Sequence, residues 1–256
     1  MQRRIWYIVT ILGVFISGCA TYQVSGMPTG DQRLVYRDGH QTIISLKENA
    51  VAVSVKEDTL SGSDRLEFIV AVNNRTSEEL TFSTENISAT ANNISTLETF
   101  TLHVYTYDEL VAEEEKRRTW EIIGAAISGA ADSYSAAYAG YSTTYGTYPD
   151  TTYDYGAAEA ARIAANAKTN AEIARIGAEG KATLQELALT ILKIHTVFPE
   201  EWYGGVIQVD PPKNSTTESK IDLLVYFGED EHAFRFIRKK IEKTSTSDRP
   251  SKTEKE

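Results

Sequence analysis

Residues 65–72 read Arg-Leu-Glu-Phe-Ile-Val-Ala-Val, and this stretch decides the fold class. Apolar side chains occupy every second position, which is the period of a β-strand with one buried face. The positions that share this face are Leu66, Phe68, Val70 and Val72. A turn-forming sequence, Asn-Asn-Arg-Thr-Ser, follows directly at residues 73–77. The stretch therefore predicts a strand that packs one face on a hydrophobic core and ends in a turn.

Short segments with the same alternation lie on both sides of this strand. They cover residues 42–46, 51–55, 80–82, 100–107, 205–209, 221–227 and 233–238. Seven or eight short strands at this spacing are typical of an antiparallel sandwich. We therefore expect a β-sandwich built from residues 41–107 and 196–240.

The hydrophobic period changes to about 3.6 between these two blocks, over residues 108–195. Asp108 is a suitable N-cap for a first helix that runs to about Gly140. A second helix is expected from about Ala157 to His195, and each helix would be roughly 50 Å long. The expected fold class is α+β: an antiparallel β-sandwich with a long inserted antiparallel α-helical hairpin.

Each predicted helix carries a heptad seam. The seam of the first helix consists of Trp120, Ile123, Ile127, Ala130, Tyr134, Ala137 and Tyr141. The seam of the second helix consists of Ala160, Ala164, Ala167, Ala171, Ala174 and Ala178. A seam of large residues that faces a seam of alanines allows close antiparallel packing. We therefore expect the two seams to face each other.

The first helix also carries a face of small residues around Asp132. Its candidate packing positions are Gly124, Ser128, Gly129, Ala136 and Gly140. Such faces allow two backbones to approach closely in membranes or oligomers. Three interpretations stay open for this face: ordinary packing inside the hairpin, packing between protomers, and insertion into a bilayer.

The predicted tip of the hairpin, residues 141–155, is rich in tyrosine. Six of the 14 tyrosines of the chain lie between Tyr138 and Tyr155. Tyrosine offers a large contact area at low entropic cost, with a hydroxyl for hydrogen bonds. The tip is therefore either a contact surface for a protein, a glycan or a neighbouring protomer, or a low-complexity loop without a fixed structure. Its candidate contact residues are Tyr141, Tyr145, Tyr148, Tyr153 and Tyr155.

Catalytic motifs are missing from the sequence. The four histidines form no His-Glu-x-x-His pattern, and the chain has neither a Gly-x-Ser-x-Gly elbow nor a phosphate-binding glycine loop. The acidic turn Glu229-Asp-Glu-His232 could bind a cation, but four consecutive polar residues in a hairpin turn are more often simply solvated. His103 is expected to be a half-buried structural residue. We expect no enzymatic activity, no metal and no cofactor.

The N-terminus has the layout of an export signal. Arg3 and Arg4 precede an apolar run of about 12 residues, which is shorter than the roughly 20 residues of a spanning helix. The run ends in Ile-Ser-Gly-Cys at residues 16–19, and this motif resembles the lipobox of bacterial lipoproteins. The resemblance implies a signal peptide at residues 1–18 and a lipid anchor on Cys19, the only cysteine of the chain.

The residue that follows Cys19 is alanine rather than aspartate, which in this family implies sorting to the outer membrane. Residues 19–40 hold Gly26, Pro28 and Gly30, and we expect them to form a lipidated flexible tether. The polar tail at 241–256 is expected to be disordered. The net charge of −10 becomes −12 once Arg3 and Arg4 are removed, so nucleic acid is not an expected partner.

The stretch Phe68-x-Val-x-Val-Asn-Asn-x-Thr76 resembles strands of immunoglobulin-like domains in bacterial envelope proteins. This resemblance implies a fold and no activity. The expected function is a non-enzymatic envelope lipoprotein, anchored to the outer membrane and facing the periplasm, that presents its hairpin to a partner protein. Two alternatives stay open: a protomer of an oligomeric outer-membrane assembly or pore, and a glycan-binding module.

Overall fold

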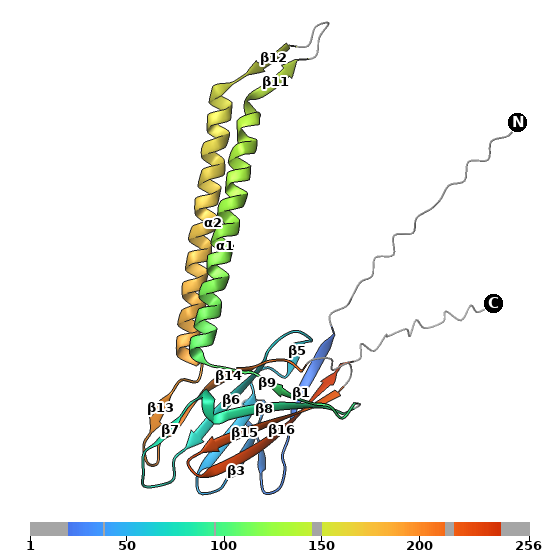
Figure 1. The fold of residues 1–256 in the computed structure, drawn as a ribbon, viewed down its shortest axis with the longest axis vertical. Helices are drawn as coiled ribbons and strands as arrows, with labels where there is room; N and C mark the ends of the chain where they lie inside the picture. The colour runs from blue at the N-terminus through green and yellow to red at the C-terminus, as the bar shows by residue number, and fades with distance from the viewer. Residues whose placement is uncertain (1–19, 38, 95, 145–149, 213–217, 242–256) are drawn as a thin grey trace, which may run out of the picture.

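Two antiparallel sheets of six strands face each other in the computed structural model, which describes residues 20–37, 39–94, 96–144, 150–212 and 218–241 (Figure 1). The first sheet has the order β5 (Thr59–Ser61), β1 (Thr21–Met27), β16 (Asp230–Lys240), β15 (Glu218–Phe227), β8 (Ile87–Asn93) and β9 (Thr99–Leu102). The second has the order β10 (Val104–Tyr105), β14 (Trp202–Val209), β6 (Leu66–Asn73), β4 (Ala50–Val55), β3 (His40–Leu46) and β2 (Arg33–Arg37). A short pair, β13 (His195–Val197) and β7 (Leu80–Phe82), and a single 3-10 turn (Thr84–Asn86) complete this part.

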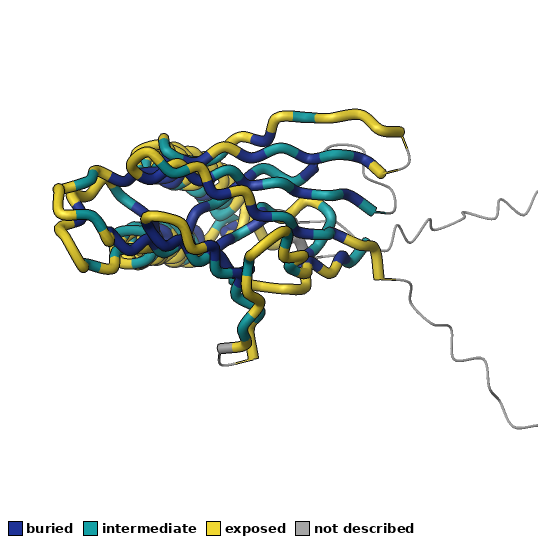
Figure 2. The backbone as a smooth tube through the Cα atoms, turned by 90° about the horizontal axis from the view of Figure 1, so that it is seen from below, coloured by how far each residue is buried: buried dark blue, intermediate teal, exposed yellow. Residues whose placement is uncertain are grey.

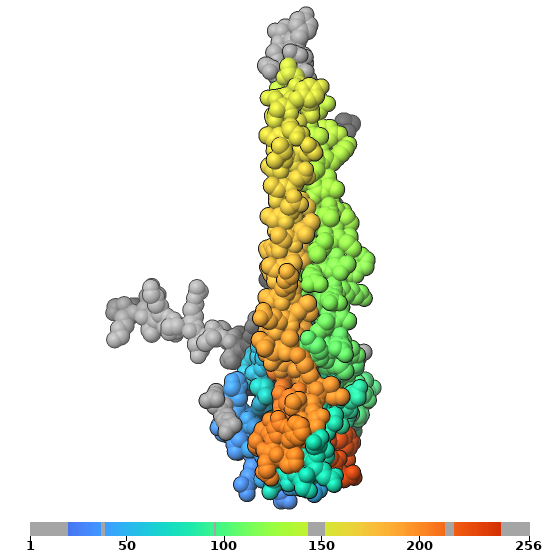
Figure 3. All heavy atoms as spheres, turned by 90° about the vertical axis from the view of Figure 1, so that its left-hand side faces the viewer, coloured from blue at the N-terminus to red at the C-terminus, as the bar shows by residue number. Residues whose placement is uncertain are grey.

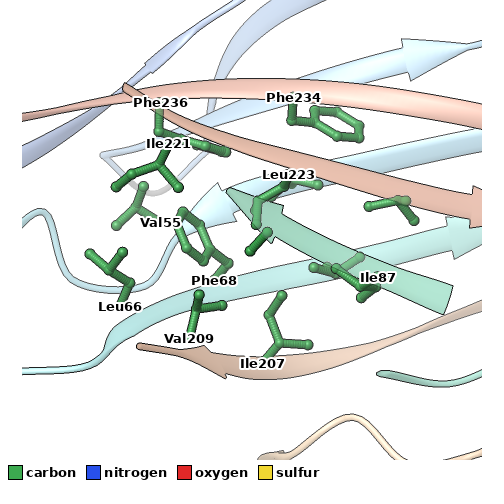
Figure 4. Packing of buried hydrophobic residues seen from close by; sticks show 14 of the residues in the cluster. Val55, Leu66, Phe68, Ile87, Ile207, Val209, Ile221, Leu223, Phe234 and Phe236 are labelled. Carbon is green, nitrogen blue, oxygen red and sulfur yellow. The ribbon is translucent and has the colours of Figure 1, made fainter. Parts of the chain in front are cut away.

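The hydrophobic core fills the space between the two sheets. Figure 2 shows buried and less buried positions alternating along the strands, as the period of two predicts. The ring of Phe68 on β6 lies 4.8 Å from the ring of Phe236 on β16, between centroids, so the sheets interlock across the interior (Figure 4). Burial of such aromatic side chains contributes about 1.5–3 kcal/mol each. The predicted α+β class with a β-sandwich is thereby confirmed at the level of architecture.

The N-terminal segment is part of the sandwich, so the prediction of a flexible tether over 19–40 is wrong for its described part. β1 pairs with both β5 and β16, and β2 pairs with β3. Tyr22 and Val24 are buried on one face of β1, and this burial outweighs the turn-forming tendency of the glycines that follow. Only Ala20 separates Cys19 from β1. The signal segment, Cys19 and the tail from residue 242 lie outside the described residues.

The inserted hairpin is confirmed, with different ends. α1 (Tyr107–Ala136) continues through the 3-10 turn Ala137–Gly140 into β11 (Tyr141–Thr144), which pairs with β12 (Asp150–Tyr153) before α2 (Tyr155–Thr190) returns. At 1.5 Å per residue the helices are about 45 and 54 Å long. No helix in the described part of the chain is long and apolar enough to cross a membrane.

Both helix ends at the sandwich differ from the prediction. The N-cap of α1 is Thr106, not Asp108, because the Thr106 hydroxyl accepts from the Glu109 amide while the Glu109 carboxylate accepts from the Thr106 amide. α2 ends at Thr190 rather than near His195. The next residues leave the helix because the Leu192 amide donates to the Val206 carbonyl of β14, at 2.9 Å.

A small second core fixes the base of the hairpin on the sandwich. Leu110 of α1, Ile191 and Val206 of β14 are buried together. Arg65, which precedes β6, donates to Glu113 of α1 at 2.7 Å. β1 begins at the same end of the sandwich from which the hairpin rises (Figure 1). The hairpin therefore projects past the point at which the chain enters the sandwich.

Candidate interaction surface

The two helices approach each other through small residues. A Cβ placed on Gly129 of α1 would lie 2.1 Å from the hydroxyl oxygen of Thr169 on α2, and one on Gly140 would lie 2.6 Å from the Asp154 carbonyl oxygen. Gly180 of α2 is buried in the same way against Arg118. These contacts assign Gly129 and Gly140 to ordinary packing inside the hairpin.

The other predicted packing positions are not part of that contact. A Cβ on Gly124 would meet nothing within 4 Å, and Ser128 is exposed. Ala136 is half-buried. The five positions therefore do not form one continuous contact face, because a spacing of four residues drifts around a helix whose turn holds 3.6 residues.

The two predicted heptad seams do not face each other, so that prediction is wrong. All seven seam residues of α1 and all six seam alanines of α2 are exposed. The glycines decide this outcome, since a close approach at Gly129, Gly140 and Gly180 turns the bulky positions away from the partner helix. Figure 3 shows the two helices packed side by side along their length.

The outward positions form two stripes. The large-residue stripe of α1 and its continuation consists of Trp120, Ile123, Ile127, Tyr134, Tyr138 and Tyr141, all exposed large hydrophobic side chains. The alanine stripe of α2 consists of Ala160, Ala164, Ala167, Ala171, Ala174 and Ala178. Trp120, Ile127 and Tyr134 are 64%, 66% and 69% exposed, which is unusual for large apolar side chains at regular spacing. A contiguous apolar surface of this kind marks an interaction site.

Tyrosines extend the large-residue stripe to the tip. The Tyr134 and Tyr138 hydroxyls lie 3.1 Å apart, and this hydrogen bond raises the pKa of Tyr138 above its usual value. The rings of Tyr141 and Tyr153 lie 4.6 Å apart and those of Tyr153 and Tyr155 4.7 Å apart, between centroids. β11, β12 and the first residue of α2 thus hold three of the predicted contact tyrosines, Tyr141, Tyr153 and Tyr155, in one row. Tyr145 and Tyr148 lie outside the described residues.

Charge is distributed unevenly along the hairpin. Residues 122–158 contain three aspartates and no lysine, arginine or glutamate. Asp132 is paired with Lys168 of α2 at 2.9 Å, and the carboxylate of Asp154 caps α2 by accepting from the amides of residues 156 and 157. Near the base, by contrast, Arg117 bridges Glu114 and Glu121, which raises its pKa. Residues 122–158 therefore contain no basic residue, and the charges of the upper hairpin are concentrated on α2, where Arg162 is paired with Glu159.

The histidines have structural surroundings. His103 lies between β9 and β10, outside any strand, and its side chain is 49% exposed. Its Nε2 lies 3.2 Å from the Glu109 carboxylate that caps α1. His232 is fully buried with its Nδ1 2.9 Å from the Ser45 hydroxyl, so the acidic turn does not present it to a cation. No group of three potential metal ligands exists among the residues that the structure describes.

The sandwich offers no acid pair poised for catalysis in the hollow beside β8. That hollow is lined by Asn92, Leu97 and Lys220 among others, and its one carboxylate, Asp222, is bound by Arg235 at 2.7 Å. The interior itself is filled by the apolar core.

The sequence contained one signal for the outward stripes that the heptad pattern hid. Gly129 of α1 and Gly140 of the 3-10 turn that follows it lie where the other arm of the hairpin comes close, and they define the inner face, whereas Gly124 does not. No protein-family profile, curated protein or solved structure matches the chain.

Proposed function

We propose that this chain is a non-enzymatic envelope lipoprotein whose projecting hairpin binds another protein. The observation that carries the proposal is the large-residue stripe, an exposed apolar surface on a helix that is packed on its other side. Protein interfaces are enriched in tyrosine and tryptophan and depleted of charge at their centres, which is the composition of the large-residue stripe.

The lipobox-like motif supports attachment to a membrane through acylated Cys19, with sorting to the inner face of the outer membrane. Several acyl chains on one residue make such anchoring effectively permanent. Since only Ala20 separates Cys19 from β1, the anchored sandwich would lie against the bilayer with its hairpin end nearest to the lipid. The hairpin would then extend along the bilayer surface rather than away from it. Our proposal also includes an immunoglobulin-like fold for the sandwich, which its two antiparallel sheets support.

The experiment has one arm for the anchor and one for the surface. The mass of the N-terminal peptide from membranes reports acylation, and Cys19→Ser moves the protein out of the membrane fraction if Cys19 is the anchor. A photo-reactive amino acid at Ile127 should form a protein adduct in living cells. The same group at Tyr226, an exposed aromatic position on the sandwich, serves as the control. Equal adduct yields at both positions, or none at Ile127, contradict the hairpin as the binding surface.

A further inference from the structure

We propose that the partner of the hairpin is a second copy of this chain, and that the large-residue stripe of one copy packs on the alanine stripe of the next. This inference rests on the proposed role of the hairpin as a protein-binding surface and names its partner. It follows from three properties of the stripes: their position on opposite edges, their matched levels and their lack of charge.

The two stripes lie on opposite edges of the hairpin. Gly129 meets Thr169 at the contact between the helices. Ile127 is two residues from Gly129, and Ala171 is two residues from Thr169. Two residues correspond to about 200° around a helix, so both side chains point away from the helix–helix contact, in opposite directions. One hairpin therefore carries both halves of the interface and cannot bring them together itself.

The stripes are also matched in level. Because α1 and α2 run antiparallel, each step back from Gly129 along α1 corresponds to one step forward from Thr169 along α2. Ile127 is therefore level with Ala171. The same count places Trp120 level with Ala178 and Tyr134 level with Ala164. The close approach of Gly140 to Ala158 gives the same register at the upper end. Trp120, Ile127, Tyr134 and Tyr138 thus each have an alanine at their own height on the opposite edge, whereas Ile123 is level with Arg175, one residue from Ala174.

Two hairpins that stand side by side in the same direction would bring these levels together. At the layers of Trp120, Ile127, Tyr134 and Tyr138 a large side chain would then meet a small one, the arrangement that lets antiparallel helices interdigitate. Neither stripe contains a charged residue, and Arg175, which borders the alanine stripe, is already paired with Glu172 and Glu179. Over Trp120 to Tyr138 the contact would be about 27 Å long. Because different edges meet, each copy leaves one edge available and the association continues to a ring or a row.

Disulfide crosslinking tests this contact directly. In the full chain, the double variant Ile127→Cys with Ala171→Cys places thiols on opposite edges of one hairpin, so a disulfide between them can form only between copies. Mild oxidation of membranes should give a ladder of dimers, trimers and higher species on non-reducing gels. Each single variant alone should give less than a tenth of that crosslinked material. A mixture of the two single variants, carrying different tags, should give a mixed dimer and no ladder.

A register control uses Ile127→Cys with Ala160→Cys, which lies on the same stripe but about 16 Å away in level. Disulfides require Cα atoms within about 7 Å, so this pair should not form the ladder. The unmodified chain shows what Cys19 contributes. A ladder of equal strength from the shifted pair, or no ladder from the matched pair with helical circular dichroism intact, overturns the inference. Efficient dimers from Ile127→Cys alone would instead indicate symmetric α1–α1 packing and also overturn it.

A charge variant gives a readout without cysteines. Ile127→Asp should lower the mass of the detergent-solubilised protein to that of one copy, while the neighbouring Ser128→Asp should leave the assembly intact. An assembly that persists in Ile127→Asp counts against the inference. The test of the anchor and the test of the contact between copies are independent. An unacylated Cys19 would contradict the lipoprotein proposal, whereas the disulfide ladder alone would still decide whether the copies pack together.

Discussion

Gly129 and Thr169 meet where the two helices of the hairpin come closest, and there is no room between them for a methyl group. A Cβ on Gly129 would lie 2.1 Å from the Thr169 hydroxyl oxygen and 2.8 Å from the Thr169 Cβ. Rotation of the threonine cannot relieve the second distance, since it does not move its own Cβ. The close approach of the two helices at this level therefore depends on Gly129.

Substitution of this glycine should destabilise the helical hairpin. We expect Gly129→Ala to cost about 1–3 kcal/mol through overpacking, despite the higher helix propensity of alanine. The control is Gly124→Ala, because a Cβ there meets nothing within 4 Å and should stabilise the helix by about 0.5–1 kcal/mol. Thermal unfolding followed at 222 nm measures both. Shifts of equal sign in the two variants would show that the helices do not pack as described.

Asn74 joins the end of β6 to the segment that follows the hairpin. Its fully buried side-chain amide donates to the carbonyls of Glu78 at 2.6 Å and Val197 at 2.9 Å, and its oxygen accepts from Thr76. Asn74→Ala should cost about 2–4 kcal/mol, because buried carbonyls lose their donors. Asn73→Ala, which removes a single bond to Glu201, should cost about 1 kcal/mol. Urea unfolding would refute this ranking if Asn73→Ala were the more destabilised.

Arg238 covers the ring of Tyr22 and joins β16 to β1. The guanidinium carbon lies 3.6 Å from the ring centroid, and Nη2 donates to the Gly62 carbonyl at 3.1 Å. Burial lowers the pKa of Arg238. A double-mutant cycle of Arg238→Met and Tyr22→Leu should give a coupling energy of about 1–2 kcal/mol, as expected for a desolvated cation–π pair. Additive effects, within about 0.5 kcal/mol, would show that the contact contributes nothing specific.

His232 should make stability depend on pH. Burial lowers the pKa of this fully buried imidazole below its ordinary value of 6.5. Above pH 6.5 the folded and unfolded states are both neutral, and stability is complete. Below pH 6.5 the unfolded chain takes up a proton that the folded chain resists, so stability is lost as the pH falls towards the folded pKa.

The measurement is urea unfolding at pH 7.5 and pH 5.5. When the pH is lowered from 7.5 to 5.5, the free energy of unfolding of His232→Gln should fall by about 1 kcal/mol less than that of the wild type. Ionisation of carboxylates affects both proteins alike and cancels in the comparison. His40→Gln, at an exposed position, should keep the dependence of the wild type. The idea fails if both substitutions change the pH dependence equally.

The sandwich should fold without the hairpin. No member of the main core lies between Leu102 and Leu192, and the ends of the insertion meet at Leu110 and Ile191. Replacement of residues 108–189 by a short Gly-Ser linker should leave a β-type circular dichroism spectrum and a cooperative transition. The melting temperature should fall by only a few degrees, since just the small second core is lost. A variant that melts without cooperativity would show that the hairpin is needed for folding.

The sequence predicted most of the architecture because strand and helix periods are local properties. The strand at 65–72 and the change of period at residue 108 are visible without any tertiary information. β1 was missed because its pairing with β16 joins the two ends of the chain, and the glycines after Val24 suggested a loop. The residues of the two outward stripes were identified as seams, but they were expected to face each other inside the hairpin. Heptad spacing gives the period of a face, whereas the close contact at Gly129 decides which face turns inward.

The neighbouring ends of the hairpin make its length independent of the sandwich. Addition of one heptad to each helix would move the tip by about 10 Å and leave the strands, the main core and the base contacts unchanged. Equal additions would also keep the existing levels of the two stripes matched, whereas an addition to one helix alone would not. In two versions of the chain with hairpins of different length, the stripes would therefore align over their full length only between copies of the same version. On the proposed contact, the number of helical layers would determine which copies assemble together.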